Sequence, residues 1–192
     1  MIDCPMVDLD LWLRNGYNVF FISDTHFHHP NIIKYCGRPF KDVEAMNKAL
    51  IENWNRVVRK EDYVFCLGDF CLGSKEQIIE IGRQLNGVKI LIMGNHCRGT
   101  KKTYEEAGFS KVCKNGLDVY CSEIGNIHLT HYPMSPDLMA IGAINIHGHI
   151  HSKAIFDEDS PKHWCVCAEA TDYTPIEYKE LIELFRKNLF NK

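Results

Sequence analysis

The stretch Val19-Phe20-Phe21-Ile22-Ser23-Asp24-Thr25-His26 predicts both the type of fold and the place of its binding site. It begins with a continuous apolar run, which is typical of a strand that is buried on both faces. An acid and a histidine follow almost at once, and in α/β sheets ligands bind in the crevice outside the carboxyl ends of the strands. We therefore expect this strand to deliver Asp24 and His26 to a site.

Four other places share this pattern of an apolar run followed by metal-capable side chains: Gly68-Asp69, Gly94-Asn95-His96, His131 and Gly148-His149-Ile150-His151. Asp and Asn are ordinary turn residues, and a short His-rich loop can arise without a function. Turn chemistry explains any one of these places, but for the whole set it has to hold five times. We favour one shared site over a series of unrelated turns.

The side chains at these places suit metal ions. Seven of them are candidate metal ligands: Asp24, His26, Asp69, Asn95, His131, His149 and His151. Mixed nitrogen and oxygen donors suit Mn, Fe or Zn better than Ca or Mg, and seven ligands are too many for one tetrahedral zinc. They suit two ions that share a carboxylate, and such a pair, roughly 3.5–4 Å apart, can hold a phosphate and activate water.

The composition predicts one domain over residues 1–192, since 45% of the residues are hydrophobic and 24% are charged. The net charge of -3 provides no bulk positive field for long nucleic acid. No stretch approaches the roughly 20 apolar residues of a membrane span. Residues 1–5 carry an acid where an export signal would be basic, and the nine cysteines include no C-x-x-C pair. We therefore expect a reduced, cytoplasmic protein.

Local signals place the remaining elements. Asp42 can cap a long amphipathic helix, and Ser74 with Gln77 forms a capping box for another. Thr174-Pro175 and Glu177 predict the start of the last helix, whereas residues 8–13 alternate in part like a half-buried strand. Strands are expected at 63–67, 88–93, 117–121, 127–131, 143–147 and 164–168.

The ordered set of five motifs, spanning residues 24 to 151, resembles the calcineurin-like metallophosphoesterase superfamily. The flanking stretches are similar to the small bacterial and phage phosphoesterases of that superfamily: Ser23-Asp24-Thr25-His26-Phe27, Asn31-Ile32-Ile33, Arg38-Pro39-Phe40 and Asp172-Tyr173-Thr174-Pro175. The resemblance implies an α/β fold in which two mixed β-sheets pack as a sandwich flanked by helices. It also implies a small phosphate-ester substrate.

The resemblance further implies which residues bind which ion. One metal would take Asp24, His26, Asp69 and His151, and the other would take Asp69, Asn95, His131 and His149, so that Asp69 bridges them. A hydroxide between the metals would attack phosphorus, and His96 would stabilise or protonate the leaving oxygen. His29 and Arg38 match positions near the metal loop from which they could contact phosphate.

This chain departs from the family pattern in two places. Cys97 follows Gly94-Asn95-His96 where an acid is usual, and a neutral thiol supports a protonated His96 less well. His28 stands where relatives have glycine; it either narrows the pocket or contacts substrate, or it is an exposed loop residue.

The resemblance favours a phosphodiesterase over other functions. The chain lacks the Asp-Arg-Gly of the protein phosphatases, because Asp69 is followed by Phe70 and Cys71. The alternatives are a phosphomonoesterase, a nuclease and a non-catalytic metal-binding scaffold on the same fold. The intact ligand set argues against the scaffold.

Overall fold

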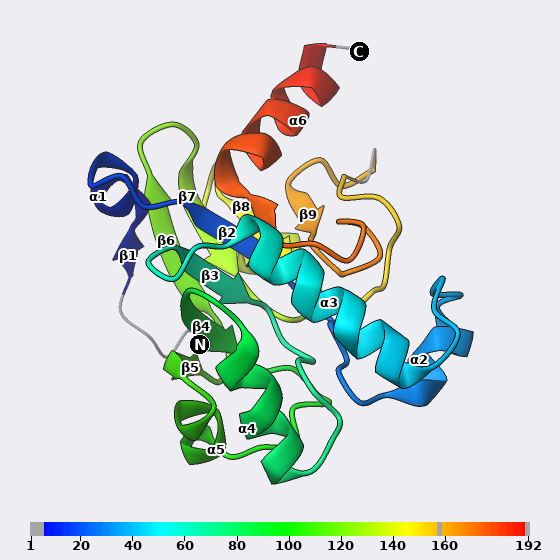
Figure 1. Ribbon diagram of the computed structural model, residues 1–192. Helices are drawn as coiled ribbons and strands as arrows, with labels where there is room; N and C mark the ends of the chain where they lie inside the picture. Colours follow the sequence, from blue (N-terminus) through cyan, green and yellow to red (C-terminus); the bar gives the residue numbers. More distant parts are fainter. Residues whose placement is uncertain (1–5, 157–158, 191–192) are drawn as a thin grey trace.

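The computed structural model describes residues 6–156 and 159–190, so the expectation about an export signal at residues 1–5 lies outside the described residues. Two mixed β-sheets form the centre of the molecule (Figure 1). The first has the order β10-β2-β3-β4-β5, with bounds Ile176–Glu177, Val19–Ile22, Tyr63–Cys66, Val88–Ile92 and Phe109–Cys113. Strands β2 to β5 are parallel, and β10 is antiparallel to β2.

The second sheet has the order β1-β6-β7-β8-β9, with bounds Val7–Asp8, Leu117–Cys121, Gly125–Leu129, Ile144–His147 and His163–Cys165. Strands β6 and β7 form an antiparallel hairpin, whereas β7, β8 and β9 run parallel. A parallel bridge between Ser23 and Cys167 joins the two sheets where β2 ends. Both sheets therefore direct strand ends to the same region of the molecule.

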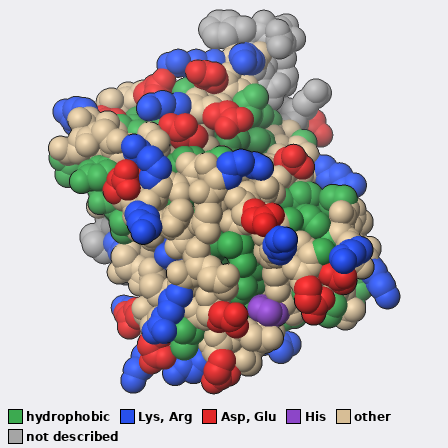
Figure 2. Space-filling model, in the orientation of Figure 1, with side chains coloured by type: hydrophobic (Ala, Val, Ile, Leu, Met, Phe, Trp, Pro, Cys, Tyr) green, Lys and Arg blue, Asp and Glu red, His purple; other side chains and the backbone are tan. Residues whose placement is uncertain are grey.

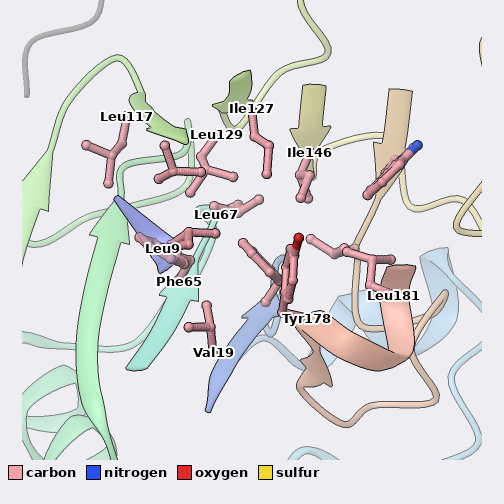
Figure 3. Packing of buried hydrophobic residues seen from close by; sticks show 14 of the residues in the cluster. Leu9, Val19, Phe65, Leu67, Leu117, Ile127, Leu129, Ile146, Tyr178 and Leu181 are labelled. Carbon is pink, nitrogen blue, oxygen red and sulfur yellow. The ribbon is translucent and has the colours of Figure 1, made fainter. Parts of the chain in front are cut away.

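Strand β2 shows why the sandwich forms. All its residues are buried, and because strand side chains alternate in direction, Phe21 packs between the two sheets while Phe20 and Ile22 pack against the helices. Figure 3 shows the inter-sheet side: Val19, Phe65 and Leu67 of the first sheet face Leu129 and other residues of the second. Helix α6 (Tyr178–Phe190) contributes Tyr178 and Leu181 to the same cluster.

Three helices cover the outer face of the first sheet: α3 (Val43–Val57), α4 (Lys75–Gln84) and α5 (Lys101–Glu106) (Figure 1). The predicted caps of the first two are confirmed, because the Asp42 side chain accepts from the Ala45 N–H and Ser74 forms a capping box with Gln77. The remaining helices are α1 (Leu9–Arg14), α2 (Pro30–Tyr35) and the short 3-10 helix η1 (Pro136–Leu138).

Several local predictions are wrong. Residues 9–14 form helix α1, which Asp8 caps, so the alternation was misleading: Leu9 is buried but Leu11 is 57% exposed. Residue Ile176 pairs with Phe21 in β10, and helix α6 begins only at Tyr178, beyond the expected cap. Strand β5 was not predicted.

Two further expectations concern the thiols and the membrane. Among the residues that the structure describes, seven cysteines are free thiols, whereas Cys113 is disulfide-bonded, so the expectation of a reduced chain is wrong at that residue. Among the helices of residues 6–156 and 159–190, none combines the length and the apolar character needed to cross a membrane.

Candidate metal centre

The predicted ligands gather where the parallel strands of both sheets end. Asp24 and His26 follow β2, Asp69 follows β3, and Asn95 follows β4, because the carboxyl ends of parallel strands share one edge. The second sheet supplies His131 after β7 and the histidines at 149 and 151 after β8. The backbone N–H of Ser23 donates to Val166 O at 2.8 Å and so ties the sheets together here.

One group of donors surrounds Asp24. Its Oδ1 lies 3.7 Å from His26 Nε2 and 3.6 Å from His151 Nε2. The same His26 nitrogen is 3.6 Å from Oδ2 of Asp69. These separations exceed a hydrogen bond, and Asp24, His26 and His151 could hold one ion between them.

A second group of donors surrounds His131. Its Nε2 lies 3.5 Å from Oδ2 of Asp69 and 2.8 Å from Oδ1 of Asn95. The ring of His149 stands 5.1 Å from the ring of His131. Asp69 Oδ2 therefore faces an imidazole of each group, which is the position expected of a bridging carboxylate. All seven predicted ligands lie in these two neighbouring groups.

The buried polar atoms fit a cation. Asp24 Oδ1 and both ring nitrogens of His26 are buried without a hydrogen-bond partner among the described residues, and Asp24 and His26 are 0% and 2% exposed. Buried polar groups are normally paired, because an unpaired one costs about 1–3 kcal/mol. An ion between these donors would satisfy them, so the residues present suit the two metals that the sequence predicts.

The glycines of the motifs leave room for the ligand side chains. A Cβ on Gly94 would lie within 3.0 Å of Asp69 Oδ1, and one on Gly148 would meet both Ser23 and Asp24 at such distances. Gly68 is confined in the same way by the ring of His131. A side chain at any of these three positions would therefore collide with a predicted ligand from another motif.

The backbone is also strained at the site. Five of the seven ligands have positive φ: Asp24 at 55°, His26 at 51°, Asp69 at 48°, His149 at 71° and His151 at 50°. Residues other than glycine rarely adopt this region, at a cost of about 1–3 kcal/mol each, and such strain collects at functional sites. The loops turn sharply after each strand so that their side chains point back to one place.

Two ligand histidines are oriented by a second bond. His131 donates from Nδ1 to the carbonyl oxygen of Leu67 at 2.9 Å, and His151 donates from Nδ1 to Glu169 Oε1 at 3.1 Å. Such bonds turn Nε2 toward a metal and are typical of metal-binding histidines. Sequence reasoning missed Glu169, although an acid directly after the apolar run Val166-Cys167-Ala168 obeys the rule that found Asp24.

Arg38 has a different place from the one predicted. Its guanidinium is buried and bonds to Glu169 Oε1 (2.8 Å from Nη2), to the carbonyl of Asp24 (2.7 Å) and to that of Thr25 (2.8 Å). These bonds use the guanidinium within the protein, so the expected contact with phosphate is replaced by a structural role. The buried Arg38–Glu169 pair braces the backbone of Asp24 and the ring of His151 together.

The other two candidates lie at the centre. The exposed His96 has its ring 5.6 Å from that of His26, and its backbone N–H donates to Asp69 Oδ1 at 2.8 Å. The ring of His29, which is half-buried, lies 5.4 Å from that of His26. His28 is half-buried rather than exposed, and its Nδ1 accepts from Gln77 Nε2 at 3.3 Å.

Asp24 and His149 have protonation states that favour metal binding. Burial alone would raise the pKa of Asp24, but the neighbouring imidazoles of His26, His131 and His151 hold it below its usual range. Burial, reinforced by the neighbouring His131, lowers the pKa of His149. Burial alone would also lower the pKa of His151, but the bond to Glu169 and the charge of Asp24 raise it. Ionised carboxylates and neutral imidazoles are the forms that bind metals.

Comparisons with known proteins agree with this geometry. Residues 17–164 match the family model of the calcineurin-like phosphoesterases. The chain is 37% identical to an uncharacterized protein of Methanocaldococcus jannaschii, over 88% of this chain and 92% of that protein. It is 32% identical to the gene 66 protein of Mycobacterium phage D29, over 72% of this chain and 80% of that protein.

A solved structure shows the same fold. The crystal structure of a protein of unknown function from Aquifex aeolicus matches with a TM-score of 0.66 and 26% identity, covering 88% of this chain and 99% of that one. The chain therefore belongs to the calcineurin-like phosphoesterase family, a class of metal-dependent phosphoric ester hydrolases. The predicted two-sheet α/β sandwich is confirmed.

Proposed function

We propose that this protein is a two-metal phosphodiesterase that hydrolyses a small phosphodiester. The observation that carries the proposal is the position of Asp69, whose Oδ2 lies 3.6 Å from His26 Nε2 and 3.5 Å from His131 Nε2. A carboxylate shared between two sets of donors suits a pair of ions. When bound, two ions supply positive charge to the phosphate oxygens and acidify a water molecule.

The chain's own groups supply positioning and a proton. Water adds to phosphorus while one ester P–O bond breaks, and the departing oxygen needs a proton to leave as an alcohol. His96 stands at the mouth of the centre, exposed, with its backbone fixed by the bond to Asp69. It is the residue best placed to give that proton or to stabilise the charge on the oxygen. A phosphomonoester is the other product.

Two features support a diester over a monoester. Phe70, which follows Asp69, is fully buried against Tyr104 and Phe109, and the guanidinium of Arg38 is engaged within the protein. Phe70 is uncharged and the Arg38 guanidinium is already bonded, so neither side chain supplies the extra positive charge that would favour binding of a doubly charged monoester. Cys97 bears on the leaving group instead: burial raises the pKa of its thiol, so it stays neutral beside His96 and supports a protonated imidazole less well than an acid would. We therefore expect good leaving groups to be preferred.

Hydrolysis of two nitrophenyl esters tests this function. The Mn²⁺-loaded protein is expected to turn over bis-p-nitrophenyl phosphate faster than p-nitrophenyl phosphate. Faster monoester turnover would make the protein a phosphomonoesterase. No turnover of either ester, with metal bound, would favour a non-catalytic metal-binding scaffold.

A nuclease on long nucleic acid is a weaker candidate. Figure 2 shows basic and acidic side chains intermingled on one face, and the net charge of the chain is -3. Phosphate contacts of long nucleic acids require a basic track and produce a strong salt dependence. Single-strand binding that weakens steeply with salt would favour the nuclease.

A further inference from the structure

A hollow in the protein surface lies beside the metal centre. It has a volume of about 560 Å³, and its walls come from the segment after His131, from the metal-binding loop and from strand β9. This volume falls within the roughly 300–1,000 Å³ of small-molecule pockets. No role in metal binding has been assigned to its lining residues.

The metal-binding loop separates the hollow from the metal centre. His149 and His151 belong to the metal centre, whereas Ile150 and Ser152, between and after them, line the hollow. The loop turns sharply at both histidines, which have positive φ, so one stretch of backbone serves both places. A ligand whose phosphate lies at the metals could therefore place another part of itself here.

The walls of the hollow are neutral. Among the described residues that line it there is no Asp, Glu, Lys or Arg, and much of the surface comes from Pro133, Met134, Ile150, Ile155 and Phe156. Such a hollow does not suit phosphate or any other strongly charged group. It suits an uncharged, largely apolar group of the size of a ring.

Two histidines add specific polarity. The Nδ1 of His147 lies 2.9 Å from the carbonyl oxygen of Gly148, so Nδ1 carries the proton and Nε2 is left as an acceptor. His163 likewise donates from Nε2 to Met134 O at 2.8 Å, and the two rings stand 5.9 Å apart at 64°. Each ring thus uses one nitrogen as a donor within the protein, and the other nitrogen, Nε2 of His147 and Nδ1 of His163, is the one available to a ligand.

Two exposed hydrophobic side chains lie beside the metal ligand His149. Tyr132, which directly precedes Pro133, is 51% exposed and its ring lies 4.3 Å from that of His149. Ile150 is 52% exposed on the other side of the same loop. An exposed aromatic ring beside a metal ligand offers a stacking surface for a flat group.

We propose that this hollow binds the nucleobase of a nucleoside phosphodiester whose phosphate lies at the metal centre. The inference rests on the proposed phosphodiesterase function and names its substrate class. A base is flat, uncharged and apolar on its faces, and its ring N–H or amino group can donate to an imidazole nitrogen. Alkyl and nitrophenyl arms have no such donor, so the hollow distinguishes them from a nucleoside.

Two esters with the same leaving group test the proposal. Thymidine 5′-(p-nitrophenyl phosphate) carries a base, and methyl p-nitrophenyl phosphate does not. We expect the wild-type kcat/KM for the thymidine ester to exceed that for the methyl ester by at least about tenfold, the lower end of what an apolar pocket discriminates. Ala154→Trp, which fills the hollow, should lower this ratio toward one. Lys153→Trp, an exposed neighbour, should keep it.

A binding measurement separates the two proposals. Thymidine added to the metal-free protein is expected to shift the ring ¹⁵N resonances of His147 in the wild type and in Lys153→Trp, but not in Ala154→Trp. If the methyl ester is hydrolysed but the ratio is near one and the resonances do not move, the hollow is not a base site and the phosphodiesterase function stands. If neither ester is hydrolysed yet the shifts occur, the base site stands and the proposed function fails.

Discussion

The two ends of the first sheet carry buried carboxylates in opposite situations. At the amino end Asp62 is fully buried, and its side chain accepts from the backbone N–H of Asn18 at 3.0 Å and of Arg59 at 2.9 Å, and from the Arg59 guanidinium. At the carboxyl end Asp24 is as deeply buried, yet its Oδ1 has no hydrogen-bond partner among the described residues. The sheet thus satisfies one buried acid and leaves the other open.

This difference separates stability from function. The bonds of Asp62 tie the start of β2 to that of β3, together with the bond from Val88 N to Asp62 O at 2.7 Å. At the other end the unpaired atoms and positive φ angles cost free energy in the absence of a cation. A polar site that the protein leaves unsatisfied is a site prepared for a ligand. Substitutions at the two ends should therefore have opposite effects.

The largest expected effect is that of Asp69→Asn. Removing the shared carboxylate should abolish diester hydrolysis, while an asparagine oxygen can still accept from the His96 N–H, so the fold should be kept. Turnover of bis-p-nitrophenyl phosphate and thermal unfolding measure the two effects. Retained turnover would show that Asp69 does not bridge two ions.

Gly148→Ala should damage both properties. The added Cβ would collide with Ser23 and Asp24, so we expect loss of bound metal after dialysis and a loss of stability of about 1–3 kcal/mol from overpacking. Gly142→Ala is the control, because open space surrounds that residue and only its φ of 81° is unfavourable. Equal metal content in both variants would contradict the role given to Gly148.

Glu169→Gln should weaken metal binding. An amide weakens the orienting bond to His151 and the pairing with Arg38, so we expect Mn²⁺ affinity to fall about 10–100-fold, as for other groups that orient metal ligands. Electron paramagnetic resonance of free Mn²⁺ measures the affinity directly. Glu61→Gln is the control, because it changes an exposed glutamate outside the metal centre and should leave the Mn²⁺ affinity unchanged. An unaltered Mn²⁺ affinity in Glu169→Gln would show that Glu169 does not orient a metal ligand.

Asp62→Asn is the counterpart of Asp69→Asn and should have the smallest effect on activity. We expect turnover to persist and the free energy of unfolding to fall by about 1–3 kcal/mol, because buried bonds are weakened. A loss of turnover at unchanged stability would contradict the purely structural role given to Asp62.

The difference in unfolding free energy between the wild type and Asp62→Asn should depend on pH, because Asp62 has a shifted pKa in the wild type. Burial alone would raise that pKa, but the Arg59 guanidinium and the N–H groups of Asn18 and Arg59 lower it. The stabilisation is therefore fully present above the unfolded pKa of about 3.9 and is lost as pH falls through the lower folded value. Urea unfolding at several pH values should show the difference between wild type and variant shrinking below about pH 4.

The ligands could be predicted from the sequence because each comes shortly after an apolar run. An apolar run of four to six residues identifies a buried strand, and the residue that follows it is placed at the sheet edge by the strand itself. Glu169 obeys the same rule but carries no family motif, so it was missed.

Other features depend on partners far along the chain. Arg38 and Glu169 are 131 residues apart, and the pairing that removes the guanidinium from phosphate leaves no mark near either residue. Helix α1 and strand β10 were misassigned because tertiary contacts overrule local patterns: Ile176 is drawn into pairing with Phe21 despite a strong capping signal. The order of strands in the two sheets is likewise a tertiary property.

The most direct measurement is the binding of Mn²⁺ to the metal-free protein, followed by electron paramagnetic resonance. The account predicts two ions per chain whose spectra show spin coupling, and loss of that coupling in Asp69→Asn but not in Asp62→Asn. A single bound ion, or two ions without coupling, would contradict a centre built around the shared Asp69 carboxylate.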